Sequence, residues 1–160
     1  MTKNLIERLN KGPVLCAEGY LFAMERRGYL QAGAFVPEVV LEHPEVLSQL
    51  HREFIRSGSD VIQAFTYYGH REKLRIIGKE QLLEPLQKNA LQIANDARKE
   101  FKDLNLMVCG DVANTNIYDP NDKKSNIECQ KMFEEQVGWA KESGVDFIVA
   151  ETIVWVEEMK

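Results

Sequence analysis

The strongest constraint on the fold of this chain is a regular alternation between short apolar runs and long amphipathic segments. Four runs, at residues 14–17, 61–65, 106–109 and 147–150, have the length and the β-branched or aromatic content of buried strands. Strands that alternate with helices pair in parallel through right-handed crossovers. The pattern therefore predicts an α/β fold around a parallel sheet.

Between these runs, apolar residues recur at helical spacing at 1–10, 44–57, 82–101 and 125–143. Local signals mark the helix ends. Pro44 suits the first turn of a helix, and Gly58 and Gly144 suit the position after a last turn. Ser125 and Glu128 form a capping-box pattern. The order of elements is thus helix and strand in alternation, followed by the start of one more helix.

Two architectures fit this order. A doubly wound open sheet is complete in about this length, whereas a (β/α)8 barrel of the TIM type typically needs ~250 residues. The sequence ends about one turn into the helix that follows the fourth strand, which favours the barrel. We expect residues 1–160 to form the N-terminal half of a barrel domain, covering about the first four β/α units.

The charge balance argues against several classes of partner. The chain has 20 Lys and Arg residues against 25 Asp and Glu residues, a formal net charge of −5, which disfavours nucleic acid and anionic membranes. It contains no apolar run of the ~18 residues that a transmembrane helix needs and no apolar signal-peptide core near its start. Three widely spaced cysteines fit a reducing compartment. We therefore expect a cytoplasmic protein.

In parallel α/β folds, ligands bind where the strands end. Polar or aromatic residues follow every predicted strand: Glu18 and Gly19, Tyr67 and Tyr68, Asn114 and Thr115, and Glu151 and Thr152. Glu18 and Glu151 directly follow apolar runs, so we expect both carboxylates to be partly buried and inward-facing. Each would either cap a helix or form an ion pair, or bind a ligand ammonium group. Gly19 would make a tight turn or let a ligand approach the backbone.

Tyr67 and Tyr68 are adjacent, so in an extended segment their rings point in opposite directions, one toward the core and the other toward a pocket. An aromatic face in that pocket would attract a quaternary ammonium or sulfonium cation. Asn114 and Thr115 fit either a turn or a ligand site.

Motifs for other chemistry are missing or broken. No glycine pattern for a dinucleotide or a P-loop occurs. A calcium-loop-like segment at 119–124 has lysines where an acidic ligand and a glycine are required. The histidines lack metal-ligand spacing, and we expect His43, His51 and His70 on the surface or as helix caps.

The cysteines also suggest no reactive site. Cys16 and Cys109 fall within predicted strands and fit small core residues, and Cys129 falls near the start of a helix. We therefore expect neither a metal site nor a catalytic nucleophile in this chain.

Four segments together resemble the homocysteine S-methyltransferase family: 18–29, 43–54 with 58–60, 64–68 and 150–152. The likeness is closest to the betaine–homocysteine branch. It implies a (β/α)8 barrel that moves a methyl group to the homocysteine thiol, giving methionine, from a cationic donor such as betaine or S-methylmethionine, or from a folate or cobalamin system. It also implies a zinc ion, held by three cysteines, that binds the thiol as the thiolate.

By this resemblance, Glu18 and Gly19 align with the acidic residue and the glycine of the homocysteine site, where the family often has Asp in place of Glu18. Glu151 aligns with the glutamate that binds the homocysteine amino group. Asn114 is a further candidate for substrate binding at the strand ends. Tyr68 aligns with the aromatic residue that contacts the methyl donor.

Departures from the family pattern carry information too. Phe35, also assigned to the donor pocket, stands where the betaine branch has Trp, and Thr152 stands where it has Tyr, which weakens the case for betaine. The zinc cysteines of the family lie in its second half, and the three cysteines of this chain do not match them. We expect the isolated chain to bind no catalytic zinc and to be inactive. Two alternatives stay open: a non-catalytic α/β domain that binds a small molecule, and a half barrel that self-associates as a homo-oligomer.

Overall fold

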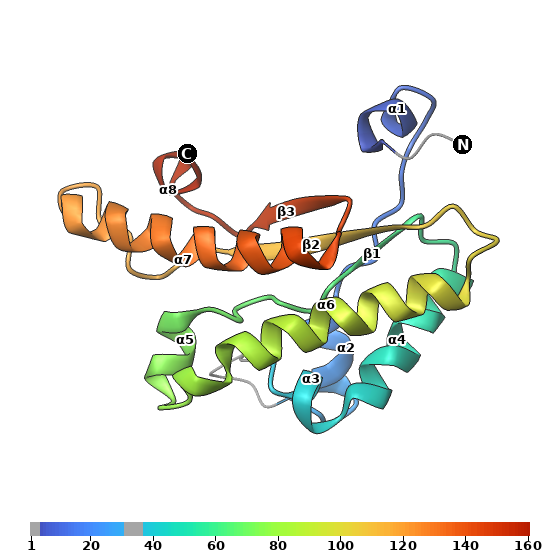
Figure 1. Cartoon of the computed structure of the whole chain (residues 1–160), viewed down its shortest axis with the longest axis horizontal. Coiled ribbons are helices and arrows are strands. Elements are labelled where there is room, and N and C mark those ends of the chain that lie inside the picture. The colour runs from blue at the N-terminus through green and yellow to red at the C-terminus, as the bar shows by residue number, and fades with distance from the viewer. Residues whose placement is uncertain (1–3, 31–36) are drawn as a thin grey trace.

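The computed structural model describes residues 4–30 and 37–160 of the chain. Its strands β1 (Val61–Gln63), β2 (Met107–Ala113) and β3 (Phe147–Glu151) form a parallel sheet in the order β1-β2-β3 (Figure 1). The predicted parallel α/β architecture is confirmed. The strands follow chain order across the sheet, as consecutive β/α units do.

The first predicted strand, at 14–17, is only partly formed. It lies beside β1 and makes one parallel bridge, between Cys16 and Val61, with the amide of Ala17 donating to the carbonyl of Val61 over 2.8 Å. The prediction of a full strand is wrong because the segment is at the edge of the described sheet. Leu15 is 58% exposed there, so little side-chain burial holds the segment flat.

Two other strand boundaries also differ from the predictions. β1 stops at Gln63 because the chain turns, with the amide of Thr66 donating to the carbonyl of Ala64 over 2.8 Å. β2 continues four residues beyond the predicted end and is buried along its whole length, to Ala113. The added residues pair with β3, from Gly110 opposite Ile148 to Ala113 opposite Glu151, and this pairing supports the longer strand.

The helical elements are α1 (Leu5–Leu9), α2 (Tyr20–Arg26), α3 (Val39–Glu42), α4 (Pro44–Arg56), α5 (Arg71–Ile76), η1 (Glu80–Leu82), α6 (Leu83–Glu100), α7 (Lys123–Ser143) and α8 (Val156–Met159). The predicted helical segments correspond to α1, α4, α6 and α7. The short helices α2, α3 and α5 have no predicted counterpart, because one or two turns are too few to show a repeat.

The predicted helix ends are mostly confirmed. Pro44 lies in the first turn of α4, and Gly58 follows that helix with φ +99°. Gly144 ends α7 with φ +73°. α7 begins earlier than the predicted capping box at Ser125, because the side chain of Asp122 caps it by accepting a hydrogen bond from the amide two residues on, over 2.9 Å.

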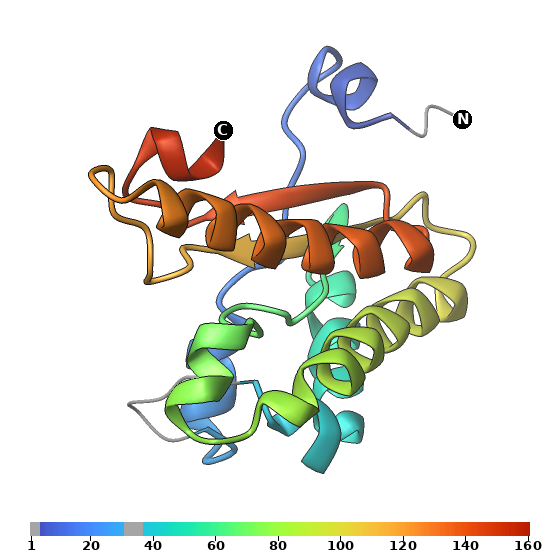
Figure 2. The ribbon, with the colours of Figure 1, turned by 60° about the vertical axis from the view of Figure 1, so that its left-hand side comes forward.

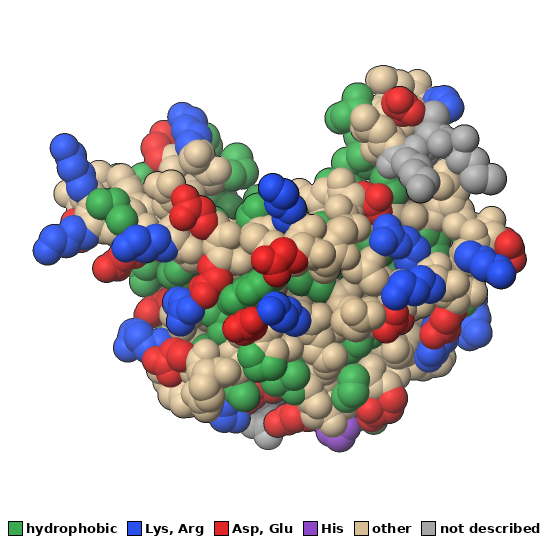
Figure 3. Space-filling view, in the orientation of Figure 1, with side chains coloured by type: hydrophobic (Ala, Val, Ile, Leu, Met, Phe, Trp, Pro, Cys, Tyr) green, Lys and Arg blue, Asp and Glu red, His purple; other side chains and the backbone are tan. Residues whose placement is uncertain are grey.

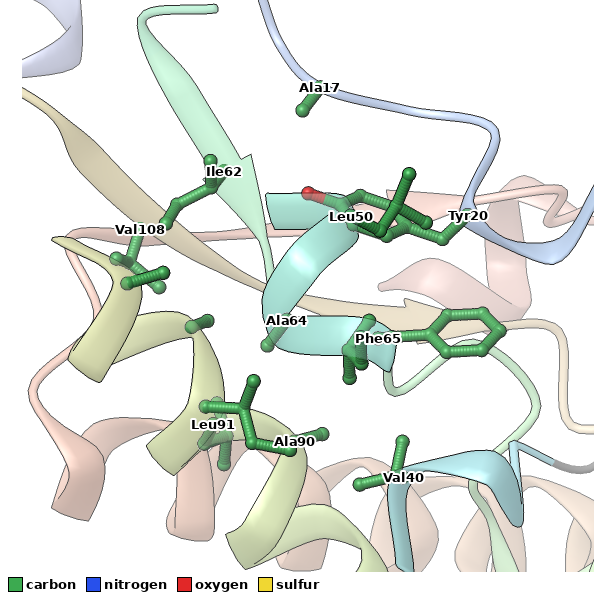
Figure 4. Close-up of a cluster of buried hydrophobic side chains, with 14 of the residues drawn as sticks. Ala17, Tyr20, Val40, Leu50, Ile62, Ala64, Phe65, Ala90, Leu91 and Val108 are labelled. Atoms are coloured by element: carbon green, nitrogen blue, oxygen red, sulfur yellow. The ribbon is translucent and has the colours of Figure 1, made fainter. Parts of the chain in front are cut away.

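The helices α4, α6 and α7 pack together and against the sheet, while α1 and α8 lie on the side away from α4 and α6 (Figures 1 and 2). The main core lies between the sheet and these helices. Ile62 and Val108 on the sheet share it with Ala90 and Leu91 of α6 (Figure 4). Ile62, Val108 and Ala90 have no exposed surface.

The opposite face of the sheet carries a second cluster. Val61, Met107 and Cys109 form its buried part, and Cys16 and Phe147 pack against it. Successive side chains on a strand alternate between the two faces of the sheet. Residues two or four positions after these cluster residues on the same strands therefore belong to the same face: Gln63, Asp111 and Glu151. The polar side chains at the strand ends thus lie above the second cluster.

Acidic and basic side chains are interspersed on the face shown in Figure 3. Several form ion pairs between elements. Arg52 of α4 makes two hydrogen bonds to Glu100 of α6, at 2.7 and 2.8 Å, and Arg98 of α6 binds Asp146 before β3 at 2.8 Å. Such surface pairs each contribute about 0.2–1 kcal/mol. In the described ranges, no helix is both long and apolar enough to cross a membrane.

Candidate functional site

A cleft of about 390 Å³ opens at the carboxyl ends of the strands. We call it the strand-end cleft; it is lined by Glu18, Gly19, Tyr20, Leu21, Phe22, Gln63, Phe65, Tyr67, Glu151 and Thr152. Three of the predicted substrate-binding residues, Glu18, Gly19 and Glu151, therefore lie in one cleft, although more than a hundred residues separate the first from the last.

Glu151 is the best-positioned carboxylate of the cleft. It is the last residue of β3 and pairs in register with Ala113 of β2. Its Oε1 accepts a hydrogen bond from Nε2 of Gln63 over 2.9 Å. Glu151 is half-buried, as expected, while Gln63 is 4% exposed. The amide restricts the carboxylate to a defined position at the edge of the cleft.

Glu18 lies on the outer rim of the same cleft and is exposed. The prediction that it is partly buried is wrong, because the segment before it is the sheet edge and is covered less than β2. Gly19 has φ +80° and precedes the first turn of α2. A left-handed backbone suits glycine, which accounts for the residue type at this position and is compatible with both predicted roles of Gly19.

Asp111 is a buried carboxyl group that was not among the predicted site residues. Its side chain is on the cleft face of β2 and is 3% exposed. Burial, followed by the charge of Glu151, raises its pKa well above the ordinary value. In the described part of the chain neither of its oxygens has a hydrogen-bond partner, and the same is true of Oε1 of Gln63. An acidic residue inside the apolar run of β2 is the signal that could have identified it.

Tyr20, which also lines the cleft, connects α2 to α4 and β1. Its hydroxyl lies 3.0 Å from Nδ1 of His51 and accepts a hydrogen bond from the backbone N–H of Gln63 over 3.4 Å. His51 is fully buried, and burial lowers its pKa to about 3. The expectation that His51 is a surface or capping residue is therefore wrong. The position of His51 on the apolar face of α4 explains its burial.

His70 does cap a helix, as predicted: its Nδ1 accepts a hydrogen bond from the amide of Lys73 at the start of α5, at 3.5 Å. It is nevertheless 1% exposed, and burial lowers its pKa to about 4. His43 is exposed, with Nδ1 3.4 Å from Glu45.

The two tyrosines do not point in opposite directions as predicted. Tyr68 has φ +55°, so the segment is a turn and not extended, and the ring centroids of Tyr67 and Tyr68 are 4.2 Å apart. Neither ring is fully buried. Tyr67 lines the cleft and its hydroxyl lies 3.5 Å from Oγ1 of Thr152. Tyr68 does not line the cleft, and Nζ of Lys73 lies 3.9 Å from its ring centroid.

The remaining candidates are next to the cleft or outside the described residues. Asn114 follows β2 and is half-buried; its Oδ1 accepts from Oγ1 of Thr152 at 3.3 Å, and its Nδ2 donates to Asn116 at 2.7 Å. It joins the ends of β2 and β3 without lining the cleft. Phe35, the other candidate for the donor pocket, is outside the described residues.

The cysteines do not fit a zinc site of three thiolates. Cys16 and Cys109 lie on the cleft face of the sheet, whereas Cys129 is in α7 with its sulfur 3.1 Å from Oγ1 of Thr115. Contact with the Cys16 thiol and burial raise the pKa of Cys109, so it stays a thiol. Across residues 4–30 and 37–160, no group of three or more His, Cys, Asp or Glu side chains is placed to hold a metal.

The fold matches that of known methyltransferases. The homocysteine methyltransferase MmuM from Escherichia coli, in its metallated form, superposes with a TM-score of 0.78 at 22% sequence identity, over 97% of this chain and 59% of that chain. At this identity the match establishes the fold class only.

The sequence comparisons identify the family. The family model for homocysteine S-methyltransferase matches residues 19–160. Betaine–homocysteine S-methyltransferase 1 from Mus musculus is 39% identical over 158 residues, which is 98% of this chain and 38% of the relative. The Sus scrofa protein of the same name is also 39% identical, with 56% of its length covered. This chain belongs to the homocysteine S-methyltransferase family, and it spans well under two thirds of the length of these relatives.

Proposed function

We propose that residues 1–160 form the homocysteine-binding half of a methyltransferase that transfers a methyl group to the homocysteine thiol and produces methionine. The observation that carries the proposal is the Glu151 carboxylate, held at the strand-end cleft by Gln63 over 2.9 Å. Family membership adds the substrate class.

The chemistry of the cleft suits the amino acid end of homocysteine. The ammonium group is a cation with three donors, and a carboxylate fixed at the cleft edge is a strong partner for it. Glu18, which lines the same cleft, is a second acidic residue near the ligand. Gly19 has no side chain and an empty space where a Cβ would be, so a ligand can approach the backbone there.

The nucleophile in this reaction is the thiolate of homocysteine, and a free thiol is mostly protonated at neutral pH. Coordination to zinc would supply the thiolate by lowering the pKa of the thiol. The cysteines of this chain do not fit such a site, so none of them is proposed as a zinc ligand. The isolated chain is accordingly expected to bind homocysteine without turning it over.

The sheet would close into a (β/α)8 barrel if further strands paired with β3 on one side and with the segment 14–17 on the other. Support for this comes from the parallel pairing in chain order and from the fold match to MmuM. We assign the protein to the cytoplasm on the basis of its thiol content.

The methyl donor is proposed to be a cation of the betaine or S-methylmethionine type, bound near Tyr68 and Phe35. The aromatic character of these positions supports the proposal, because ring faces attract cations. The Tyr68 ring already has Lys73 beside it, so a donor on that ring would have to displace the lysine.

The proposal is tested by titrating the 160-residue chain with L-homocysteine under reducing conditions and following binding by calorimetry. Glu151→Gln should weaken binding by at least about tenfold, since a hydrogen bond to a charged group contributes about 1.5–3 kcal/mol. Glu142→Gln, an exposed substitution in α7, is the matched control. Absence of binding by the unmodified chain, or equal binding by Glu151→Gln, would contradict the proposal.

A self-associating half barrel is the second candidate. It is favoured by the apolar side chains that remain exposed after β3: Val154 at 79%, Val156 at 57% and Met159 at 56%. Exposed apolar groups beside a sheet edge favour contact with another chain. Sedimentation equilibrium would show a concentration-dependent dimer in this case, and a monomer at all concentrations would eliminate it.

A further inference from the structure

Asp111 and Glu151 are neighbours on the cleft face of the sheet. In the β2–β3 register Asp111 is opposite Val149 and Ala113 is opposite Glu151. The two carboxyl groups are therefore one side-chain step apart on adjacent strands, close enough for the charge of Glu151 to raise the pKa of Asp111. Asp111 is beneath Glu151, away from solvent, and it is not among the residues that line the cleft.

Around this pair, buried hydrogen-bond acceptors outnumber the available donors. Gln63 uses its amide N–H on Glu151, which leaves its own Oε1 without a donor. Both oxygens of Asp111 also lack a donor within the described ranges. Three buried acceptors in one place are costly to leave unpaired. A proton on Asp111 would turn one of these acceptors into a donor.

We propose that Asp111 is protonated at neutral pH and donates a hydrogen bond to Glu151, so that Asp111 is a positioning residue for the carboxylate that recognises the amino group. The role given to Glu151 rests on the proposed function. Asp111 itself does not contact the ligand.

The surroundings of Asp111 favour the neutral form. The titratable groups that face it are Glu151 on β3, Glu18 before α2 and Cys109 on β2, while Gln63 on β1 is uncharged. Burial disfavours the carboxylate, and the two glutamates disfavour it further because they repel a third negative charge. The raised pKa of Asp111 agrees with this arrangement.

The protonation of Asp111 can be measured without any ligand. In a chain labelled with ¹³C at the aspartate carboxyl carbons, Asp111 is assigned by the signal lost in Asp111→Asn, and Asp103→Asn at an exposed position is the control. The Asp111 signal should keep the chemical shift of the acid at pH 7. In Glu151→Gln the midpoint of the Asp111 titration should fall by about one pH unit or more, because the negative charge of Glu151 is removed. A carboxylate signal at pH 7, or a midpoint unaffected by Glu151→Gln, would overturn the proposal.

Ligand binding tests the positioning role. Asp111→Asn keeps a side-chain donor, and its homocysteine affinity should stay within about threefold of the unmodified chain, whereas Asp111→Ala should lose about tenfold or more. Circular dichroism confirms that each variant is folded. Equal losses in both variants would overturn the positioning role. If the unmodified chain binds no homocysteine, the proposed function fails, and the carboxyl titration still decides whether Asp111 is protonated and coupled to Glu151.

Discussion

The side-chain amide of Gln63 reaches across β2 and donates to Oε1 of Glu151 over 2.9 Å, joining residues that are 88 positions apart. Gln63 pairs in register with Cys109 of β2 and Glu151 pairs with Ala113. The hydrogen bond therefore runs diagonally over the buried Asp111 and connects β1 to β3. The position of the candidate amine-binding carboxylate thus depends on a strand that is not its direct neighbour.

Removing this amide should weaken homocysteine binding with little loss of fold. Gln63→Leu is expected to reduce affinity by about tenfold, because Glu151 loses a hydrogen bond of about 1.5–3 kcal/mol that holds it in place. Gln49→Leu, an exposed glutamine of α4, is the control. Isothermal titration of both variants is the measurement, and equal affinities would show that Gln63 does not position Glu151.

The buried His51 should make stability depend on acidity. Its pKa falls from 6.5 to about 3 on folding, so below pH 6.5 the unfolded chain takes up a proton that the folded chain does not. The free energy of unfolding should therefore be unaffected by this group above pH 6.5. It should decrease as the pH falls from 6.5 toward about 3, by up to about 1.4 kcal/mol per pH unit for this group. His70, with a pKa of about 4 in the fold, contributes in the same direction.

The measurement is urea unfolding at pH 7, 6, 5 and 4 for the unmodified chain and His51→Gln. Between pH 6 and 4, the free energy of unfolding of His51→Gln should change less steeply with pH than that of the unmodified chain, by about 1.4 kcal/mol per pH unit. His43→Gln, at an exposed position, is the control. An unchanged slope in His51→Gln would contradict the assignment.

Replacing two glycines with alanine should change the free energy of unfolding in opposite directions. A Cβ on Gly69 would lie 2.9 Å from the carbonyl oxygen of Thr66 and 3.0 Å from a methyl carbon of Leu86, so Gly69→Ala should lower the free energy of unfolding by about 1–3 kcal/mol. Gly138 in α7 has nothing within 4 Å of that position. Gly138→Ala should stabilise the fold by up to about 1 kcal/mol, since alanine is the better helix former. Chemical denaturation of both variants decides the signs, and stabilisation by Gly69→Ala would refute the close approach.

The cation beside Tyr68 should compete with a cationic methyl donor. Lys73→Met removes a charge whose Nζ is 3.9 Å from the ring centroid, so binding of betaine should strengthen by about two- to fivefold, in line with about 0.5–1 kcal/mol for a cation on a ring face. Lys88→Met, an exposed substitution in α6, is the control. Betaine binding followed by NMR is the measurement. No difference between the two variants would remove Tyr68 from the donor site.

Local signals determined much of the fold. Pro44 at the start of α4 and Gly144 at the end of α7 act through their own backbone preferences, so the sequence alone located those helix ends. The alternation of apolar runs and amphipathic segments determined the parallel α/β class. The same order put Glu18 and Glu151 after strands, which predicted that they would meet at one end of the sheet.

Other features depended on contacts between distant segments, and only the tertiary structure decided them. The burial of Asp111, the hydrogen bond between Gln63 and Glu151 and the enclosure of His51 by Tyr20 each need strands or helices that are far apart in the chain. The left-handed turn at Tyr68 likewise overrode an extended prediction. Backbone preferences act over a few residues, whereas burial and charge coupling depend on which distant side chains the fold places next to a residue. The sequence therefore predicted where the candidate site would lie, and the packing of three strands decided how its carboxyl groups interact.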